Sequence, residues 1–230
     1  MITEERTRKE VDGIQRLLAP APGAKLLDLC CGHGRITIPL AQLGCHMTGQ
    51  DLSEYFLERA RRDAEAKGLS VRWVRGDMRR IPFEGEFDAV INVFSSFGYL
   101  EDESEDAGVL RQVHKALKPG GRFLSDEMNR DFFFANYHPS SITRRPSGVV
   151  SLEEHAIDLI TSRDNLRLTL IDPDGSQRTH RYSLRLYTAR ERLRMLADCG
   201  LQVEAVYGSF DGIPLTLRAP RLIIVARKPL

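Results

Sequence analysis

Three aspartates follow three short apolar runs in the first third of the chain. Asp28 lies near the end of the run at residues 25–31, Asp51 ends the second run, and Asp77 ends the third. The carboxyl ends of parallel strands share one edge of a sheet, so these acids are expected to line one cleft. A carboxylate there can accept hydrogen bonds from loop N–H groups and ligand hydroxyls, or oppose a cationic group.

Two glycines stand where the first apolar run passes into a helix. Gly32 and Gly34 lack Cβ atoms, so a ligand can approach the backbone and the free N–H groups of the helix start. Asp51, at the tip of the second strand, is placed to bind both hydroxyls of a ribose. Asp77 and the backbone of Met78 are placed to read an adenine edge. Together these groups predict a nucleoside pocket.

The spacing of apolar residues predicts the elements that position these groups. Strands are expected at residues 25–31, 46–52, 70–78, 87–94, after the turn at 117–121, and at 201–208 and 221–228, with helices at residues 3–18, 54–68, 102–117 and 188–200. Strands that alternate with helices at this spacing imply right-handed crossovers. We therefore expect an α/β fold with a doubly wound, mainly parallel sheet of seven strands.

The alternation breaks after residue 130. A short aromatic helix is expected next, followed by strands near residues 149–160, 165–172 and 178–187 with no helix between them. Asp-Pro-Asp-Gly is a strong turn signal between the last two. This pattern divides the chain into a core of residues 1–130 and 188–230 and an antiparallel insertion of residues 131–187, expected to act as a lid.

Composition excludes several classes of protein. The 230 residues are 42% hydrophobic and 28% charged, and their net charge of +1 does not favour nucleic acid or an anionic membrane. No apolar run approaches the ~18 residues of a membrane span, and the charged N-terminus is unlike a secretory signal. The four cysteines form no C-x-x-C pair, which predicts reduced thiols in a cytoplasmic protein without a metal site.

Five motifs in order resemble those of class I S-adenosylmethionine-dependent methyltransferases. LLDLCCGHGR is similar to the first motif, GQDLS to the ribose-binding strand end and GDMRRIPF to the adenine motif. FDAVINVFSSFGYL resembles the fourth strand with its active-site loop, and LKPGGRFL the turn before the fifth strand. The resemblance covers residues 5–130 and about the last forty residues. It implies a Rossmann-like fold, S-adenosylmethionine as methyl donor and S-adenosylhomocysteine as product.

The resemblance also implies roles for individual residues. It places around the cofactor Asp28, Cys30, Gly32, His33, Gly34, Asp51, Leu52, Gly76, Asp77, Met78, Asn92, Val93 and Phe94. Cys30 stands where the family often has glycine, and His33 where a small hydroxyl residue is common, but the backbone groups remain. Acceptors other than amines need a base near the methyl group; Tyr99 is our first candidate and His138 the second. A metal-assisted mechanism would favour a carboxylate at Asn92.

Two other readings of the same residues stay open. Residues 32–37 nearly read G-x-G-x-x-G, as in nicotinamide-dependent oxidoreductases, but Thr37 takes the third small position and Asp28 would repel a pyrophosphate. A non-catalytic cofactor-binding protein on the same fold is the second alternative. The fourth strand is not followed by the proline-aromatic motif of DNA methyltransferases. We therefore expect a small-molecule acceptor and a monomer or homodimer.

Overall fold

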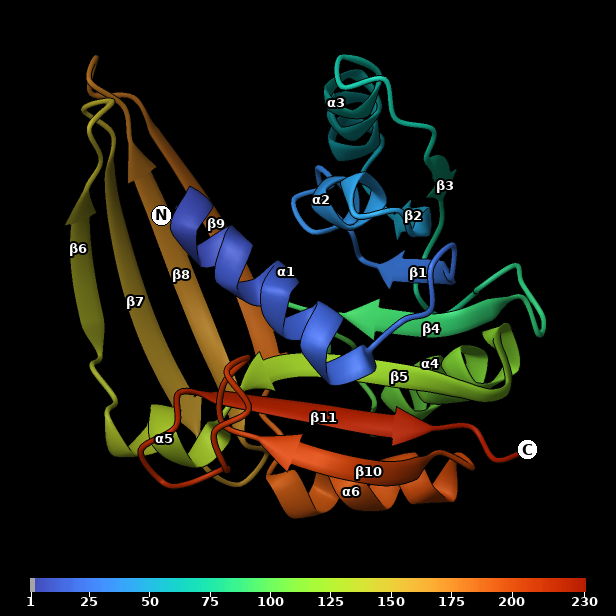
Figure 1. Ribbon diagram of the computed structural model, residues 1–230. Helices are drawn as coiled ribbons and strands as arrows, with labels where there is room; N and C mark the ends of the chain where they lie inside the picture. Colours follow the sequence, from blue (N-terminus) through green and yellow to red (C-terminus); the bar gives the residue numbers. More distant parts are fainter. Residues whose placement is uncertain (1–2) are drawn as a thin grey trace.

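The computed structural model describes residues 3–230 and contains a central sheet of seven strands (Figure 1). The strands are β1 (Lys25–Leu29), β2 (His46–Asp51), β3 (Arg72–Arg75), β4 (Phe87–Asn92), β5 (Leu117–Met128), β10 (Gln202–Tyr207) and β11 (Arg221–Arg227). Their order is β10-β11-β5-β4-β1-β2-β3. The pairs among β1 to β5 are parallel, and β11 is antiparallel to both of its neighbours. The predicted doubly wound sheet is confirmed.

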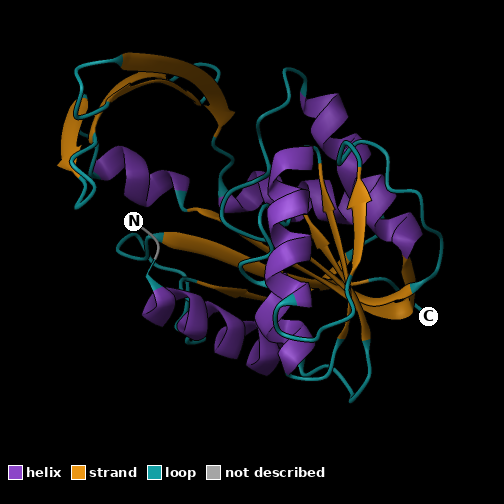
Figure 2. Cartoon of the chain, turned by 90° about the horizontal axis from the view of Figure 1, so that it is seen from above, coloured by secondary structure: helices purple, strands orange, loops and turns teal. Residues whose placement is uncertain are grey.

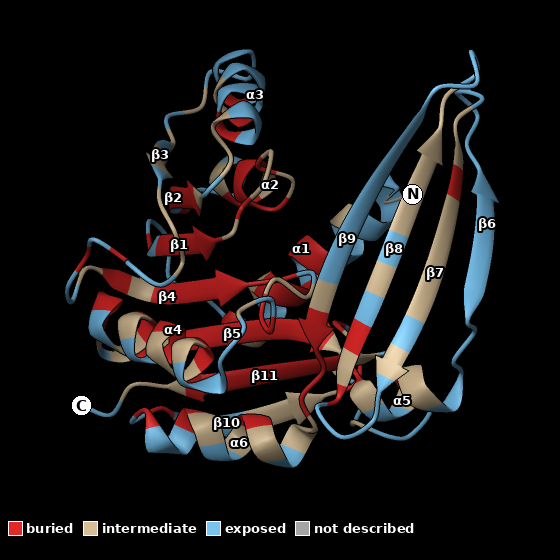
Figure 3. Cartoon of the chain, turned by 180° about the vertical axis from the view of Figure 1, so that it is seen from behind, coloured by how far each residue is buried: buried red, intermediate tan, exposed pale blue. Residues whose placement is uncertain are grey.

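Helices cover both faces of this sheet (Figure 2). They are α1 (Glu4–Leu18), α2 (Thr37–Gln42), α3 (Glu54–Glu65), α4 (Glu103–Ala116), α5 (Arg130–Ala135) and α6 (Ala189–Asp198). The sheet separates two apolar clusters, because successive side chains of a strand point to opposite faces. One cluster joins Ile14 of α1 to Ile223, and the other joins Leu110 of α4 to Ile224. The core strands are accordingly the most buried part of the chain (Figure 3).

Helix starts follow the capping residues of the sequence. The Ser53 hydroxyl accepts a hydrogen bond from the Phe56 N–H at 3.4 Å at the start of α3. Thr188 and Glu191 form a reciprocal capping box at the start of α6. Each bond satisfies an N–H group that has no partner within its own helix. The Ser53 cap, two residues after Asp51, thus starts α3 at the carboxyl end of β2.

The insertion forms a separate antiparallel sheet of four strands, with the order β6-β7-β8-β9. Its strands are β6 (Ser140–Arg144), β7 (Val150–Asp158), β8 (Arg163–Ile171) and β9 (Gln177–Arg185). The last three match the predicted strands, whereas β6 was not predicted, because its sequence SSITR is short, polar and exposed throughout. The sheet stands at the edge toward which the arrows of β1, β4 and β5 point (Figure 1).

Two arginines join the insertion to the loop that follows β4. Arg163 of β8 donates to the carbonyl of Glu101 at 2.8 Å. The backbone N–H of Arg185 in β9 donates to the carbonyl of Gly98 at 2.8 Å. A Cβ on Gly98 would lie 2.3 Å from the Arg185 carbonyl oxygen, and the φ of Gly98 is +98°. Only glycine fits at this junction, so the base of the insertion has a fixed position beside the loop.

Two negative findings apply to residues 3–230. No helix there combines the length and the apolar character needed to cross a membrane. The same residues contain no group of three or more metal-binding side chains.

Candidate active site

The turn between β1 and α2 exposes its backbone at the carboxyl edge. Cys30, Gly32 and Gly34 all have positive φ, at 63°, 56° and 79°. A Cβ on Gly32 would meet nothing within 4 Å, so the space above it is open to a ligand. A Cβ on Gly34 would lie 2.9 Å from the Trp73 ring. Gly32 therefore allows close approach to the turn, whereas Gly34 allows the turn to pack on β3.

Asp28 lies directly beneath this turn. It is 1% exposed, and its Oδ2 accepts a hydrogen bond from the Thr37 hydroxyl at 2.6 Å. Its Oδ1 has no partner among the described residues. Burial raises the pKa of Asp28 to about 7, against the opposing effects of Thr37 and Arg35. A buried carboxylate oxygen without a partner suits a cationic or hydrogen-bond-donating ligand group.

Asp51 connects the end of β2 to the glycine turn. Its Oδ2 accepts from the Gly32 N–H at 2.8 Å, and its Oδ1 accepts from the Ser53 N–H at 2.9 Å. Each carboxylate oxygen has a second lone pair, so both remain able to accept from a pair of ligand hydroxyls. The next residue, Leu52, is 65% exposed at the same edge. Asp51 thus fixes the turn and faces the space above Gly32.

His33 lies at the outer side of the turn. Its ring centroid is 6.3 Å from that of Phe56 in α3. Burial lowers the pKa of His33, and the nearby cations Arg59 and Arg35 lower it further. The imidazole is therefore neutral at physiological pH and adds no charge to the turn.

The loop after β3 departs from the arrangement expected of an adenine site. The Arg79 guanidinium contacts the Asp77 carboxylate at 2.6 Å and Glu105 at 2.7 Å. These bonds, mainly the one from the Arg79 side chain, lower the pKa of Asp77. The Met78 sulfur lies 3.7 Å from the Cys30 sulfur, so the two side chains form an apolar surface beside the turn. Asp77 is an anion at this edge, but Arg79 shares its oxygens.

Gln50 shapes the same loop and was missed in the sequence. Its side-chain N–H₂ donates to the carbonyl oxygens of Asp77 and Arg80, at 3.1 and 3.2 Å. A Cβ on Gly76 would lie 3.1 Å from that nitrogen, so glycine allows this close packing. Gln50 is fully buried. A buried amide inside an apolar strand is the sequence signal that could have found it.

Asn92, Val93 and Phe94 end β4 beside the glycine turn. Asn92 is 3% exposed and donates to the carbonyl of Leu29 at 2.9 Å, while its Oδ1 has no partner among the described residues. Phe94 and Ser95 both have positive φ, at 67° and 59°. Two consecutive non-glycine residues in this region carry strain, which the surrounding structure must offset.

Asp126 of β5 offsets that strain. Its Oδ2 accepts from the Phe94 N–H at 3.0 Å, and its carbonyl accepts from the Ser95 N–H at 2.9 Å. Arg221 of β11 holds the carboxylate through a 2.6 Å contact and also donates to the Ser95 hydroxyl at 3.2 Å. Asp126 is 1% exposed. The Asp126 carboxylate therefore holds the strained loop after β4 in place.

Arg6 of α1 and Arg35 of the glycine turn both reach this loop. The guanidinium carbons of Arg6 and Arg35 lie 5.1 and 5.4 Å from the centre of the Phe94 ring, within cation–π range. Glu10 accepts from Arg6 at 2.8 Å and is also ion-paired with Arg35. The N-terminal helix, the glycine turn and the loop after β4 are thereby joined at the carboxyl edge (Figure 1).

The two base candidates lie in different surroundings. Tyr99 is 50% exposed, and burial, followed by the charges of Tyr182 and Asp164, raises its pKa. The carbonyl of Gly98, the residue before Tyr99, accepts from the Arg185 N–H of β9 at 2.8 Å, so Tyr99 lies between the core and the insertion. His138 is exposed just before β6, and the described residues give it no hydrogen-bond partner. The structure thus brings Tyr99, and not His138, to the junction of the two sheets.

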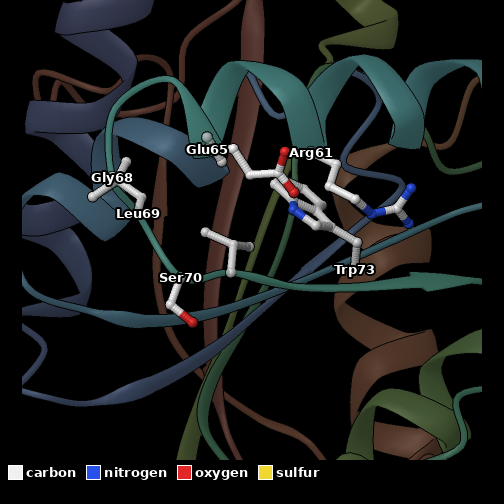
Figure 4. A pocket seen from close by; sticks show the side chains of 8 residues that line it. Arg61, Glu65, Gly68, Leu69, Ser70 and Trp73 are labelled. Atoms are coloured by element: carbon white, nitrogen blue, oxygen red, sulfur yellow. The ribbon is translucent and has the colours of Figure 1, made fainter.

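One cavity connects the insertion to the glycine turn. It has a volume of about 440 Å³ and is lined by His33, Arg35, Thr143, Arg144, Arg145, Pro146, Ser151 and Glu153. Side chains of β7 and of the β6–β7 connection therefore face the turn that carries Gly32. A second cavity, of about 530 Å³, lies between α3 and β3 and includes Arg61, Ser70 and Trp73 (Figure 4). It contains none of the predicted site residues.

A seven-stranded sheet of this order, with a glycine turn, a carboxylate after β2 and open space above the turn, defines a Rossmann-like cofactor-binding protein. Residues 26–121 match a family model described as a methyltransferase domain. The chain is 28% identical over 209 residues to the putative methyltransferase YqeM of Bacillus subtilis, covering 89% of this chain and 84% of that one.

Solved structures share the whole architecture. An S-adenosylmethionine-dependent methyltransferase from Clostridium acetobutylicum has a TM-score of 0.87 at 18% identity, over 97% of this chain and 92% of that one. CalS10, an amino pentose methyltransferase from Micromonospora echinaspora solved with S-adenosylmethionine bound, has a TM-score of 0.73 at 22% identity, over 98% and 91%. Residues 26–121 therefore form a methyltransferase domain, and the whole chain has the fold of S-adenosylmethionine-dependent methyltransferases.

Proposed function

We propose that this enzyme methylates a small molecule bound between the insertion of residues 131–187 and the carboxyl edge of the core. The observation that carries the proposal is the cavity of about 440 Å³ in which Ser151 and Glu153 of β7 face His33 and Arg35 of the glycine turn. A cavity of this size fits a small acceptor and excludes a folded macromolecule. CalS10, whose acceptor is an amino pentose, supports an acceptor of that size.

The residues at the carboxyl edge of the core sheet fit S-adenosylmethionine, the methyl donor of the proposed reaction. The unpartnered Oδ1 atoms of Asp28 and Asn92 and the open space over Gly32 are what a bound ligand would use. Asp28 and Gly32 would hold the methionine part, and Asp51 the ribose hydroxyls. The backbone around residues 76–78 would hold the adenine, with Asp77 shared between its amine and the neighbouring guanidinium.

The cofactor supplies a methyl group on a cationic sulfur. The protein's task is to align the acceptor with that methyl and to keep water away. The loop after β4 is suited to alignment, because Asp126 and Arg221 fix its strained backbone from two strands. Helix α1 is suited to exclude water, because Arg6 and Glu10 attach it to that loop and to the turn.

The net charge and the state of the cysteines bear on the class of acceptor and on the location of the protein. A net charge of +1 gives no attraction to nucleic acid, which agrees with a small acceptor. The four cysteines are unpaired, which agrees with a reducing, cytoplasmic environment. The expectation of a monomer or homodimer stays a prediction that gel filtration with light scattering can check.

Calorimetric titration tests the cofactor site first. S-adenosylmethionine and S-adenosylhomocysteine should bind the native protein, and Asp51→Ala should weaken both by at least about tenfold, the value of one or two lost charge-assisted hydrogen bonds. Asp63→Ala, an exposed acid of α3, is the matched control and should bind normally. Binding of NADH without binding of either adenosyl ligand would contradict the proposal.

Acceptor turnover is the second test. A panel of small amines, phenols and carboxylic acids, incubated with S-adenosylmethionine, should yield S-adenosylhomocysteine with at least one class. Tyr99→Ala should lower turnover without changing S-adenosylhomocysteine affinity, because Tyr99 lies on the insertion side of the site. Turnover that is unaffected by Tyr99→Ala would refute the placement of the acceptor.

A further inference from the structure

The insertion carries a histidine–carboxylate pair that the sequence reading did not single out. His155 of β7 and Asp164 of β8 are joined through Nδ1 and Oδ2 at 2.8 Å. Asp164 is 4% exposed, and the side chain of His155 is 15% exposed. A hydrogen bond from Nδ1–H to a carboxylate fixes the tautomer of the imidazole and leaves Nε2 as an acceptor.

This pair lies on the face of the insertion that is turned to the cofactor site. Alternate residues of a strand share a face, so His155 lies on the same face as Glu153 and Ser151. Those two residues line the cavity that contains His33 of the glycine turn. The Phe133 ring of α5 lies 5.8 Å from the imidazole in an edge-on arrangement. The imidazole therefore lies between the insertion sheet and α5, on the face that carries the cavity-lining residues.

Asp164 has a second feature that points to a ligand. Its Oδ1 is buried and has no partner among the described residues. Arg163, the neighbour of Asp164 in β8, donates to the carbonyl of Glu101 at 2.8 Å, in the loop that follows β4. The pair thus lies next to the loop beside which the methyl group must be placed.

We infer that His155 is the proton acceptor of the reaction, that Asp164 is its positioning residue, and that the acceptor substrate is a protonated amine. This inference rests on the proposed function. The N–H bond of the ammonium breaks and its proton moves to Nε2 of His155, which becomes an imidazolium paired with Asp164. The freed lone pair forms the N–C bond to the methyl carbon while the C–S bond breaks, and the electron pair of that bond stays on sulfur.

The groups next to the His155 imidazole favour a cation as the acceptor. Two carboxylates, Asp164 and Glu153, flank the imidazole, with Nε2 of His155 lying 3.9 Å from Glu153. The aromatic rings of Tyr99, Tyr182 and Phe133 add surfaces that attract an ammonium group. The other charged and titratable groups near this face are Tyr99, Tyr182 and His180, whose ring stacks on that of Tyr182. The mouth of the cavity carries His33, Arg35, Arg144 and Arg145, so the carboxylates lie beside the imidazole and the arginines lie farther out.

Chemical modification tests the geometry without an acceptor. Diethyl pyrocarbonate acylates a neutral imidazole nitrogen, and mass spectrometry identifies the modified residue. In protein saturated with S-adenosylhomocysteine, His155 should be modified at pH 7.5, and Asp164→Asn should slow its modification at least about tenfold, because the amide no longer fixes the reactive tautomer. Exposed His138 serves as the internal standard, and Glu154→Gln, on the opposite face of β7, as the matched control.

Several outcomes would overturn the inference. Failure of His155 to react while His138 reacts would show that Nε2 does not reach the site, and this result needs no variant. Equal reactivity in Asp164→Asn would remove the positioning role. Saturation with S-adenosylhomocysteine is confirmed first, so failure of the cofactor site is recognised separately.

The acceptor class is tested with two probes of equal size. Benzylamine should shift the His155 Cε1–H signal in the NMR spectrum of the S-adenosylhomocysteine complex, and benzoate should not. An equal response to benzoate, or no response to either, would refute an ammonium acceptor. With any turned-over amine, His155→Gln should lower kcat at least about a hundredfold and change KM for S-adenosylmethionine little. If His155→Gln lowered kcat and raised KM by similar factors, His155 would have a structural role only.

Discussion

Replacing Asp28 with asparagine should stabilise the protein without ligand and weaken its binding of S-adenosylmethionine. Asp28 is 1% exposed, and its Oδ1 has no partner among the described residues. Burial raises its pKa from the ordinary 3.8 to about 7, despite the Thr37 hydrogen bond. Folding in the absence of ligand therefore works against the ionisation of this carboxyl. An amide keeps the size of the side chain and its bond to Thr37 and has no charge to bury.

The pH dependence gives the size of the effect. The folded state holds the Asp28 proton more tightly than the unfolded state, so stability falls as pH rises from about 4 to about 7 and is then constant. A difference of about three pKa units at about 1.4 kcal/mol per unit gives a penalty of about 4 kcal/mol above pH 7. For a chain of this length that is a shift in Tm of about 8–16 °C as an upper bound.

Thermal melts of both proteins from pH 4.5 to 8.5 measure this difference. The advantage of Asp28→Asn over the native protein should grow with pH up to about 7 and stay level above it. Asp88→Asn is the control with the opposite sign: although burial raises its pKa, hydrogen bonds from Lys118 and the Lys25 N–H hold the pKa of Asp88 below its ordinary value. Asp88→Asn should therefore destabilise the protein by an amount that hardly changes between pH 4.5 and 8.5, because the contribution of this carboxylate is lost only below about pH 4. An Asp28→Asn difference that does not change with pH would refute the reasoning.

Three further predictions concern the turn, the core and the N-terminal helix. Gly32→Ala fills the open space over the turn, so the affinity for S-adenosylhomocysteine measured by calorimetry should fall at least about tenfold. The control Gly175→Ala, also at positive φ, should lower Tm without changing this affinity. Glu127→Gln leaves the fully buried Arg192 without its anion and should cost about 3–5 kcal/mol in urea unfolding; a loss below 1 kcal/mol would contradict this. Phe94→Leu removes the ring beneath two guanidinium groups and should speed proteolysis within α1, without lowering Tm by more than a few degrees.

The order of elements could be predicted because the apolar runs of the core are long and regular. β2 and β4 end in Asp51 and Asn92 after buried runs, and Asp28 is the next-to-last residue of β1. Ser53 marks the start of α3. β6 could not be predicted, since all five of its residues are exposed and no alternation appears. Strands that are held by pairing alone leave no hydrophobic signal.

The candidate site could be predicted where neighbouring residues form it. It could not be predicted where it depends on pairs of residues that are far apart in the chain. The turn with Gly32 follows from neighbouring residues. The pairing of Asp126 with Arg221, by contrast, joins residues far apart in the chain. The His155–Asp164 pair needs the register of two strands, which sequence alone does not fix. Arg79 is only two residues from Asp77 in sequence, yet its guanidinium also binds Glu105 of α4, which is far away in the chain.

The two sheets also differ in how their strands can find one another during folding. Every pair in the insertion joins strands that are consecutive in the chain, so each can form as a hairpin within microseconds. The core sheet depends on β11, which must enter between β5 and β10 although Asp126 and Ile223 are far apart in sequence. Closing so long a loop is slow. We therefore predict that the hairpins of the insertion form before β11 pairs with β5, and that the Asp126–Arg221 ion pair forms last.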